Sequence, residues 1–264
     1  MGRRRLDAEL VRRGLAASRS QAQEAVSAGR VTVAGITATK AASLVADDAP
    51  VALSGPPPSF VSRAGGKLAA ALDRFAVATD GRDCLDAGAS TGGFTDCLLQ
   101  RGASRVIAVD VGYGQLSWSL RMDTRVTVME RTNVRDLTSS MLAYVPDLVV
   151  ADLSFISLRL VLPVLAKLAG PAATFIVLVK PQFEAGRAHV GRGGVVRDPD
   201  VWRSALSSVM AAGRSASLEP LNVMASPLPG PAGNVEFPLY LLAGSRPSEV
   251  DLDGAVHEGE AFLR

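Results

Sequence analysis

DAGASTGGF, residues 86–94, joins a strand-like run at 82–85 to a helix-like run at 95–100. A glycine-rich turn between a strand and a helix commonly holds a small molecule. Three residues separate Gly88 from Gly92, so the turn lacks the Gly-x-Gly-x-x-Gly spacing of a dinucleotide site. The wider spacing favours a bulkier and less charged ligand than a pyrophosphate, although the turn alone leaves an NAD site or a purely structural role open.

Six further apolar runs of strand length follow the turn, mostly with helical stretches between them. About ten residues separate the last two runs, too few for a helical crossover, so the last strand is expected to be antiparallel. The pattern predicts a Rossmann-like α/β domain with a seven-stranded, mostly parallel sheet, preceded by a helix at 63–75. The expected strands are 83–89, 105–111, 126–130, 147–152, 174–180, 220–225 and 235–243.

Acidic residues end the first two strands, at the edge where an open parallel sheet binds its ligands. Asp110 lies 24 residues after Asp86 and is placed to accept hydrogen bonds from two ribose hydroxyls. S-adenosyl-L-methionine fits this arrangement, because its amino-acid end can reach Asp86 and the turn while its adenine reaches the segment 130–133. We therefore expect a class I methyltransferase domain. The residues expected to bind this cofactor are Asp86, Gly88, Ser90, Thr91, Gly92, Gly93, Phe94, Asp110 and Asn133.

The N-terminal region is basic. Residues 1–40 contain eight basic and three acidic side chains, which suggests a polyanionic partner, although a merely solvated face would have the same composition. Helices are expected from Leu6 to Gly14 and from Ser18 to Gly29, followed by strands at 31–33 and 36–39. This order, LDxxLVxxGLAxSRxxA followed by GxVxVxG, resembles the S4 RNA-binding module. The resemblance implies phosphate contacts by Arg3, Arg4, Arg5, Arg12, Arg13, Arg19, Arg30 and Lys40.

These patterns divide the chain into four parts. A small α+β S4-like domain is expected at 1–53 and the methyltransferase domain at 62–245. Between them, 54–61 contains the run SGPPPS, which cannot continue a helix or a central strand and is typical of a stiff linker. The polar tail at 246–264 is expected to be frayed.

Four ionisable residues lie at strand ends or beside the sheet. Asp152 ends the fourth strand, Lys180 ends the fifth and Glu236 lies in the seventh. Lys67 opens the helix before the first strand. Only four of the 28 basic residues are lysines, which suggests that these positions need an ammonium group. The alternative for each residue is an isolated surface ion pair.

These four residues match the K-D-K-E tetrad of FtsJ-like ribose 2′-O-methyltransferases, and nearly the whole chain resembles the TlyA family, which joins such a domain to an S4 domain. The shared runs include VSRAGGKL, LVKPQFEAG and ASPLPGPAGNVEF. The resemblance implies an rRNA (cytidine-2′-O)-methyltransferase that acts on 16S rRNA and also on 23S rRNA. The family carries a haemolysin label as well.

A ribose 2′-hydroxyl must lose its proton as it attacks the sulfonium methyl group. Lys180 can act as the base, oriented by Asp152, with Lys67 positioning the ribose and Glu236 holding a lysine. Lys180 can equally act as a cation that orients the hydroxyl. The four formal charges cancel, so the sequence leaves both roles open.

Other classes of protein fit less well. A pseudouridine synthase can also carry an S4 domain, but the only Arg-Leu-Asp run, at 5–7, lies in the first helix. A haemolysin would need an apolar span or a strongly amphipathic surface helix, and the sequence shows neither. A non-catalytic RNA-binding protein has no use for the tetrad. With no export signal and only Cys84 and Cys97, we expect a cytoplasmic, metal-free monomer whose partner is rRNA within ribosomal subunits.

Overall fold

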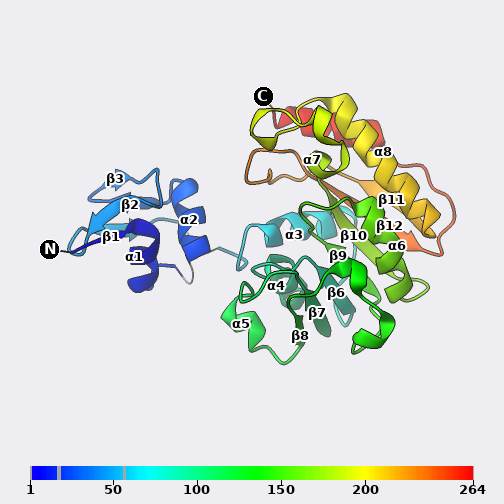
Figure 1. The fold of residues 1–264 in the computed structure, drawn as a ribbon, viewed down its shortest axis with the longest axis horizontal. Coiled ribbons are helices and arrows are strands. Elements are labelled where there is room, and N and C mark those ends of the chain that lie inside the picture. Colours follow the sequence, from blue (N-terminus) through cyan, green and yellow to red (C-terminus); the bar gives the residue numbers. More distant parts are fainter. Residues whose placement is uncertain (1, 17–18, 56–57, 264) are drawn as a thin grey trace. The chain divides into compact units, whose positions relative to one another are not determined.

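The computed structural model describes residues 2–16, 19–55 and 58–263. The chain divides into two compact units, residues 1–59 and 60–264 (Figure 1). Each unit has its own hydrophobic core. The boundary lies within the segment 54–61 that the sequence marks as a linker, of which Pro56 and Pro57 lie outside the described residues. Within the described part of the chain, each helix is too short or too polar to cross a bilayer.

The described residues of the N-terminal unit form two helices, a three-stranded sheet and a separate strand pair. Its elements are β1 Arg3–Arg5, α1 Leu6–Arg12, α2 Arg19–Ser27, β2 Val31–Val33, β3 Ile36–Thr37, β4 Leu44–Ala46 and β5 Val51–Leu53. β2 pairs with β3 and β5, whereas β1 pairs with β4, and all these pairs are antiparallel. Leu6 and Leu10 of α1 share a buried core with Val26 of α2 and Val31 of β2.

Both expected N-terminal helices are present, although Ser18, where the second was expected to begin, lies outside the described residues. Ala34 and Gly35 turn the chain between β2 and β3 with φ of +49° and +80°. A two-residue hairpin turn of type I′ requires positive φ at both positions. The sequence did not predict β1, β4 and β5, because their runs RRR, LVA and VAL lack the alternation of apolar and polar residues that VTV of β2 shows.

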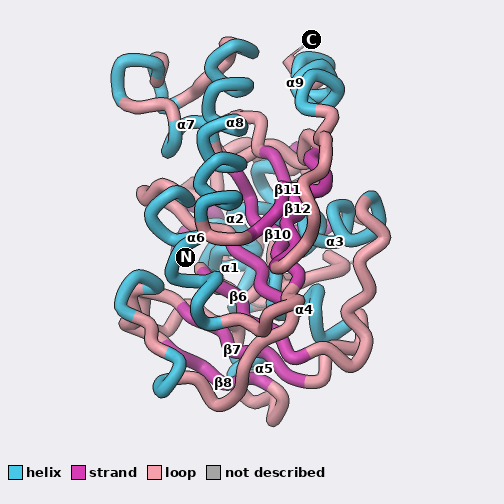
Figure 2. The backbone as a smooth tube through the Cα atoms, turned by 90° about the vertical axis from the view of Figure 1, so that its right-hand side faces the viewer, coloured by secondary structure: helices cyan, strands magenta, loops and turns pink. Residues whose placement is uncertain are grey.

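Seven strands form one sheet in the C-terminal unit. They are β6 Asp83–Ala87, β7 Arg105–Val109, β8 Val126–Met129, β9 Leu148–Ala151, β10 Thr174–Val179, β11 Leu218–Val223 and β12 Phe237–Ala243. Their order is β11-β12-β10-β9-β6-β7-β8, and Figure 2 shows the sheet from β11 to β8. β12 is antiparallel to both neighbours and the remaining pairs are parallel. The predicted Rossmann-like sheet with a reversed last strand is therefore confirmed.

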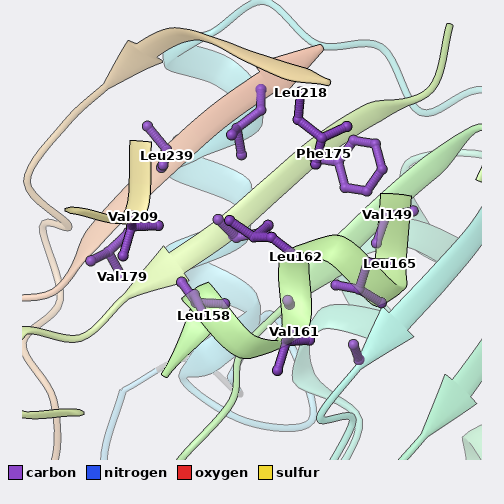
Figure 3. Packing of buried hydrophobic residues seen from close by; sticks show 14 of the residues in the cluster. Val149, Leu158, Val161, Leu162, Leu165, Phe175, Val179, Val209, Leu218 and Leu239 are labelled. Atoms are coloured by element: carbon purple, nitrogen blue, oxygen red, sulfur yellow. The ribbon is translucent and has the colours of Figure 1, made fainter. Parts of the chain in front are cut away.

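Helices cover both faces of this sheet (Figure 1). Successive side chains of a strand point to opposite faces of the sheet. Val149 accordingly belongs to the apolar cluster with α6 and α8, whereas Val150 belongs to the cluster with α3 and α4. Figure 3 shows Leu162 and Leu165 of α6 close to Phe175 of β10. The helices are α3 Ala64–Arg74, α4 Gly93–Gln100, α5 Trp118–Arg121, α6 Leu158–Leu168, α7 Pro181–Glu184 and α8 Pro199–Ser215, with 3-10 turns η1 Val134–Asp136, η2 Ser139–Met141, η3 Arg187–His189 and η4 Arg192–Gly194.

The C-terminal segment corrects one expectation. The sequence predicted a frayed tail after Ser245, but α9 Leu252–Ala261 is a packed helix that buries Ala255 and Val256. A side chain at Gly259 would place its Cβ 3.1 Å from the Trp202 ring and 3.2 Å from the Phe237 ring. The prediction was wrong because small residues form the packed face, so the segment has little apolar bulk to reveal its amphipathic pattern.

Candidate active site

The strand order places a cavity beyond the carboxyl ends of the central strands. The chain leaves β6 toward β7 and β8 on one side and returns through β9 and β10 on the other, so β6 and β9 flank the switch point where such sheets bind ligands. A cavity of about 730 Å³ opens there, within the size range of small-molecule sites. Its lining includes Gly88, Ser90, Asp110, Val111, Gln115, Asn133, Arg135, Asp152, Leu153, Ser154 and Phe155.

The glycine-rich turn forms one wall of this cavity. Gly88, Ser90 and Gly92 all have left-handed backbone conformations, with φ of +89°, +49° and +98°. A Cβ at Gly88 would lie 2.5 Å from the carbonyl oxygen of Asp152, so only glycine lets β6 and β9 approach here. The Asp110 carboxylate accepts hydrogen bonds from the backbone N–H groups of Ser90 and Gly112 at 2.8 and 2.6 Å. The turn and the end of β7 therefore form one rigid wall.

Asp86 lies beneath the turn and is fully buried. Thr95 Oγ1 donates a hydrogen bond to Asp86 Oδ2 at 2.6 Å, whereas Oδ1 has no hydrogen-bond partner among the described residues. Burial raises the pKa of Asp86 to about 7, against the lowering effect of the Thr95 hydrogen bond. An unsatisfied buried acceptor two residues before Gly88 suits a ligand that brings a positive charge or N–H donors to the cavity.

The predicted cofactor residues fall into two groups. Gly88, Ser90, Asp110 and Asn133 line the cavity. Asp86, Thr91, Gly92, Gly93 and Phe94 are not among its lining residues. Phe94 is 4% exposed and packs in the apolar cluster of α3 and α4 instead.

Lys180 and Asp152 form an ion pair at the edge of the cavity. Lys180 Nζ lies 2.6 Å from Asp152 Oδ1 and donates a hydrogen bond to Ser154 Oγ at 3.1 Å. The two charged side chains are only 9% and 15% exposed. Because little water reaches them, each charge depends on the other for its stabilisation.

Lys67 and Glu236 form a second and more deeply buried pair. Lys67 Nζ donates to Glu236 Oε2 at 2.5 Å, and the side chains are 7% and 2% exposed. A Cβ at Gly230 would lie 2.5 Å from Glu236 Oε1, so this glycine leaves room for the carboxylate. The β10–β12 register pairs Val179 with Phe237, which brings Lys180 and Glu236 to the same end of the sheet.

Several cavity residues were not predicted from the sequence. Phe155 is 92% exposed, has φ of +63°, and lies 5.2 Å from the Phe183 ring, measured between ring centroids. Gln115 lines the cavity beside Ser90. The run Asp152-Leu-Ser-Phe155 gave a signal for Phe155, since an aromatic follows the strand-end acid, but no sequence pattern marks Gln115.

Five of the eight predicted RNA-binding residues gather around two buried carboxylates in the N-terminal unit. Arg5 and Arg19 pair with Asp7, whereas Arg4, Arg12 and Arg13 pair with Glu9. Arg13 also donates hydrogen bonds to the carbonyl oxygens of Ala49 and Asp47, so its side chain stabilises the fold of the N-terminal unit as well. Arg30 donates to the carbonyl oxygen of Ser54, and Arg3 and Lys40 are exposed.

Comparison with known proteins agrees with this architecture. The family model described as FtsJ-like methyltransferase matches residues 60–242, and the S4 domain model matches residues 4–49. A Mycobacterium tuberculosis protein named 16S/23S rRNA (cytidine-2′-O)-methyltransferase TlyA is 54% identical over 90% of this chain and 90% of its own length. Hemolysin A of Brachyspira hyodysenteriae is 38% identical over 88% of this chain and 97% of its own length.

Solved structures agree as well. A Streptococcus thermophilus protein labelled a candidate hemolysin has a TM-score of 0.80 at 37% identity, covering 100% of this chain and 98% of that protein. A Listeria monocytogenes protein described as a candidate S-adenosylmethionine-dependent methyltransferase shares only the fold, with a TM-score of 0.50 at 12% identity over 69% of this chain and 99% of its own. The chain is therefore a methyltransferase of the FtsJ-like family and belongs to the TlyA family, in which this domain follows an S4 domain.

Proposed function

We propose that this protein methylates the 2′-hydroxyl of cytidine in rRNA, with S-adenosyl-L-methionine as the methyl donor. The observation that carries the proposal is the pair of buried ion pairs, Lys180 with Asp152 and Lys67 with Glu236, at the end of the sheet where the cavity opens. The name of the 54% identical Mycobacterium tuberculosis relative supports cytidine as the target and both 16S and 23S rRNA as substrates.

The cavity residues fit the cofactor chemically. Asp110 presents a carboxylate for ribose hydroxyls. Asp86 lies beneath the lining, and its unsatisfied Oδ1 favours a cationic amino-acid end above it. Asn133 and the apolar side chains of Val111 and Leu153 supply a surface for an adenine ring. The cofactor, when bound, supplies an electrophilic methyl group on a positively charged sulfur.

The two ion pairs prepare the hydroxyl for attack. As the 2′-oxygen forms its bond to the methyl carbon, the sulfur–carbon bond breaks and the hydroxyl proton must leave. We assign this proton to the lone pair of Lys180 Nζ, which requires the neutral amine. The ammonium that pairs with Asp152 must therefore first release a proton to solvent, and Asp152 and Ser154 hold the amine in place. Lys67, fixed by Glu236, positions the ribose. Fixed groups of this kind lower the barrier because they need not reorganise during the reaction.

Phe155 gives the site a surface for a nucleobase. An aromatic ring that is 92% exposed and supported by Phe183 is costly to leave in water and well suited to stack on an unpaired base. A stacked base would hold its own ribose in place, so a stacking partner beside the cavity helps to position the 2′-hydroxyl.

Methyl transfer from tritiated S-adenosyl-L-methionine to isolated ribosomal subunits and to naked rRNA tests the proposal. We expect label at a cytidine whose 3′ phosphodiester bond becomes resistant to alkali, because a 2′-O-methyl group removes the attacking hydroxyl. Lys180→Ala should abolish the label, and Lys167→Ala, an exposed lysine at the end of α6, should retain it. Absence of label on both subunits and on both naked rRNAs contradicts the proposal.

The same assay determines which subunit is the substrate. We propose that both are methylated, that the protein works as a monomer, and that it acts in the cytoplasm, where ribosomal subunits are assembled. The basic N-terminal unit provides the surface for the RNA phosphates.

A further inference from the structure

Asp7 lies beneath the basic residues of the N-terminal unit and is fully buried. Arg5 donates two hydrogen bonds to it, from Nε to Oδ1 at 3.1 Å and from Nη2 to Oδ2 at 2.8 Å. Arg19 Nη2 donates to Oδ2 at 3.1 Å, and Gln23 Nε2 donates to the same oxygen at 3.0 Å. One buried carboxylate therefore connects β1, α1 and α2.

The side chains of Arg5 and Arg19 remain accessible to solvent. The side chains of Arg5 and Arg19 are 45% and 58% exposed, although their shared partner is fully buried. A guanidinium has five N–H donors, and Arg5 uses two of them on Asp7, so three remain for an outside acceptor. Phosphate oxygens match this planar fork in geometry and charge.

All three groups are charged at neutral pH. The Arg5 guanidinium holds the pKa of Asp7 well below its usual value, and Asp7 in turn raises the pKa of Arg5. The arrangement is therefore a fixed cluster in which the guanidinium groups of Arg5 and Arg19 share the buried carboxylate of Asp7. Free arginine side chains would have to be ordered when RNA binds, whereas these two are already ordered.

We propose that Asp7 is a positioning residue that holds Arg5 and Arg19 as a preformed fork for neighbouring RNA phosphates. This inference rests on the proposed rRNA substrate. It makes a prediction opposite to that of simple electrostatics. Asp7 is an anion and by charge alone weakens the attraction of RNA, whereas as a positioning residue it strengthens binding.

Asp7→Asn separates the two roles, because it removes the negative charge and keeps the shape. We expect the full-length variant to bind transcribed 16S and 23S rRNA roughly tenfold more weakly, despite its additional unit of net positive charge. The slope of log affinity against log salt should become shallower by about one to two phosphate contacts. Asp48→Asn adds the same charge at an exposed position of the same unit, and it should bind at least as tightly as the original protein.

Arg5→Lys provides a second test that does not remove the buried carboxylate. Lysine keeps the charge but loses the fork, so affinity should fall by a similar factor, and the double variant should lose little more than either single one. Asp7→Asn binding as tightly as the original protein, or losses that multiply in the double variant, would overturn the inference. Failure of the original protein itself to bind or methylate rRNA would instead refute the proposed function.

Discussion

In the proposed reaction, individual side chains at the sheet edge carry the chemistry, and Lys180 is the most informative of them. Its Nζ lies 2.6 Å from Asp152 and 3.1 Å from Ser154, so its position is fixed and only its role is open. Lys180→Arg separates the roles, because arginine keeps the positive charge but cannot accept a proton in a protein. We expect the single-turnover methylation rate to fall by about 10²-fold or more, with cofactor affinity retained. Lys167→Arg is the matched control. A variant with near-normal rate would assign Lys180 as an orienting cation.

Phe155 tests recognition of the nucleotide at the same scale. Phe155→Ala removes a ring that is 92% exposed, so little packing is lost within the protein. Loss of one stacked base costs about 1–3 kcal/mol, which corresponds to roughly five- to 150-fold in kcat/KM for rRNA. Calorimetry should show unchanged binding of S-adenosyl-L-methionine. Phe262→Ala, a half-exposed ring just after α9, is the control and should not change methylation. Equal kcat/KM values for the two variants would exclude a stacking role.

At the scale of elements, Glu184 connects the two segments that carry the Lys180–Asp152 pair. It lies in α7, four residues after Lys180, and its buried carboxylate accepts hydrogen bonds from Ser157 Oγ at 2.5 Å and Leu158 N at 2.7 Å, at the start of α6. Glu184→Gln replaces one carboxylate oxygen with an amide N–H₂ group, which cannot accept a hydrogen bond from Ser157 or Leu158, so the contact between α7 and α6 weakens. We expect kcat to fall about tenfold with a small change in cofactor affinity. Glu249→Gln, at an exposed position, should leave kcat unchanged. Wild-type kcat in the Glu184 variant would show that the two segments hold their positions independently.

At the scale of the whole molecule, the N-terminal unit should lose stability in acid through a buried carboxylate of its own. Hydrogen bonds from Arg12 and then Arg13 lower the pKa of Glu9 to about 2, below its ordinary value of 4.5. A lowered folded-state pKa stabilises the fold above the unfolded pKa and loses that contribution as pH falls toward the folded one. The N-terminal unit should therefore lose stability between about pH 4.5 and 2.

Amide hydrogen exchange of peptides from residues 6–33 measures this loss, and both tryptophans, Trp118 and Trp202, report separately on the C-terminal unit by fluorescence. In Glu9→Gln the N-terminal unit should be less stable at neutral pH and less sensitive to acid. An unchanged acid response in that variant would show that Glu9 does not carry the effect.

The sequence by itself determined the sheet and the position of its site. Continuous apolar strands can be stable only when both faces of their sheet are covered. Residues 86–94 connect the end of a strand to the helix that follows it, so they lie at the carboxyl edge of the sheet. The scarcity of lysine marks Lys40, Lys67, Lys167 and Lys180 equally, and only the match to the K-D-K-E tetrad separates Lys67 and Lys180 from the other two.

Only the tertiary structure decided which of these side chains are buried and which remain open. Asp86 lies beneath the turn and outside the cavity lining, whereas Phe155 is exposed and lines the cavity. The helix α9 packs against Trp202 through small residues. Asp7 is hidden although it lies among exposed arginines in the chain. Burial depends on neighbours that are distant in sequence, so local patterns of charge and hydrophobicity do not determine it.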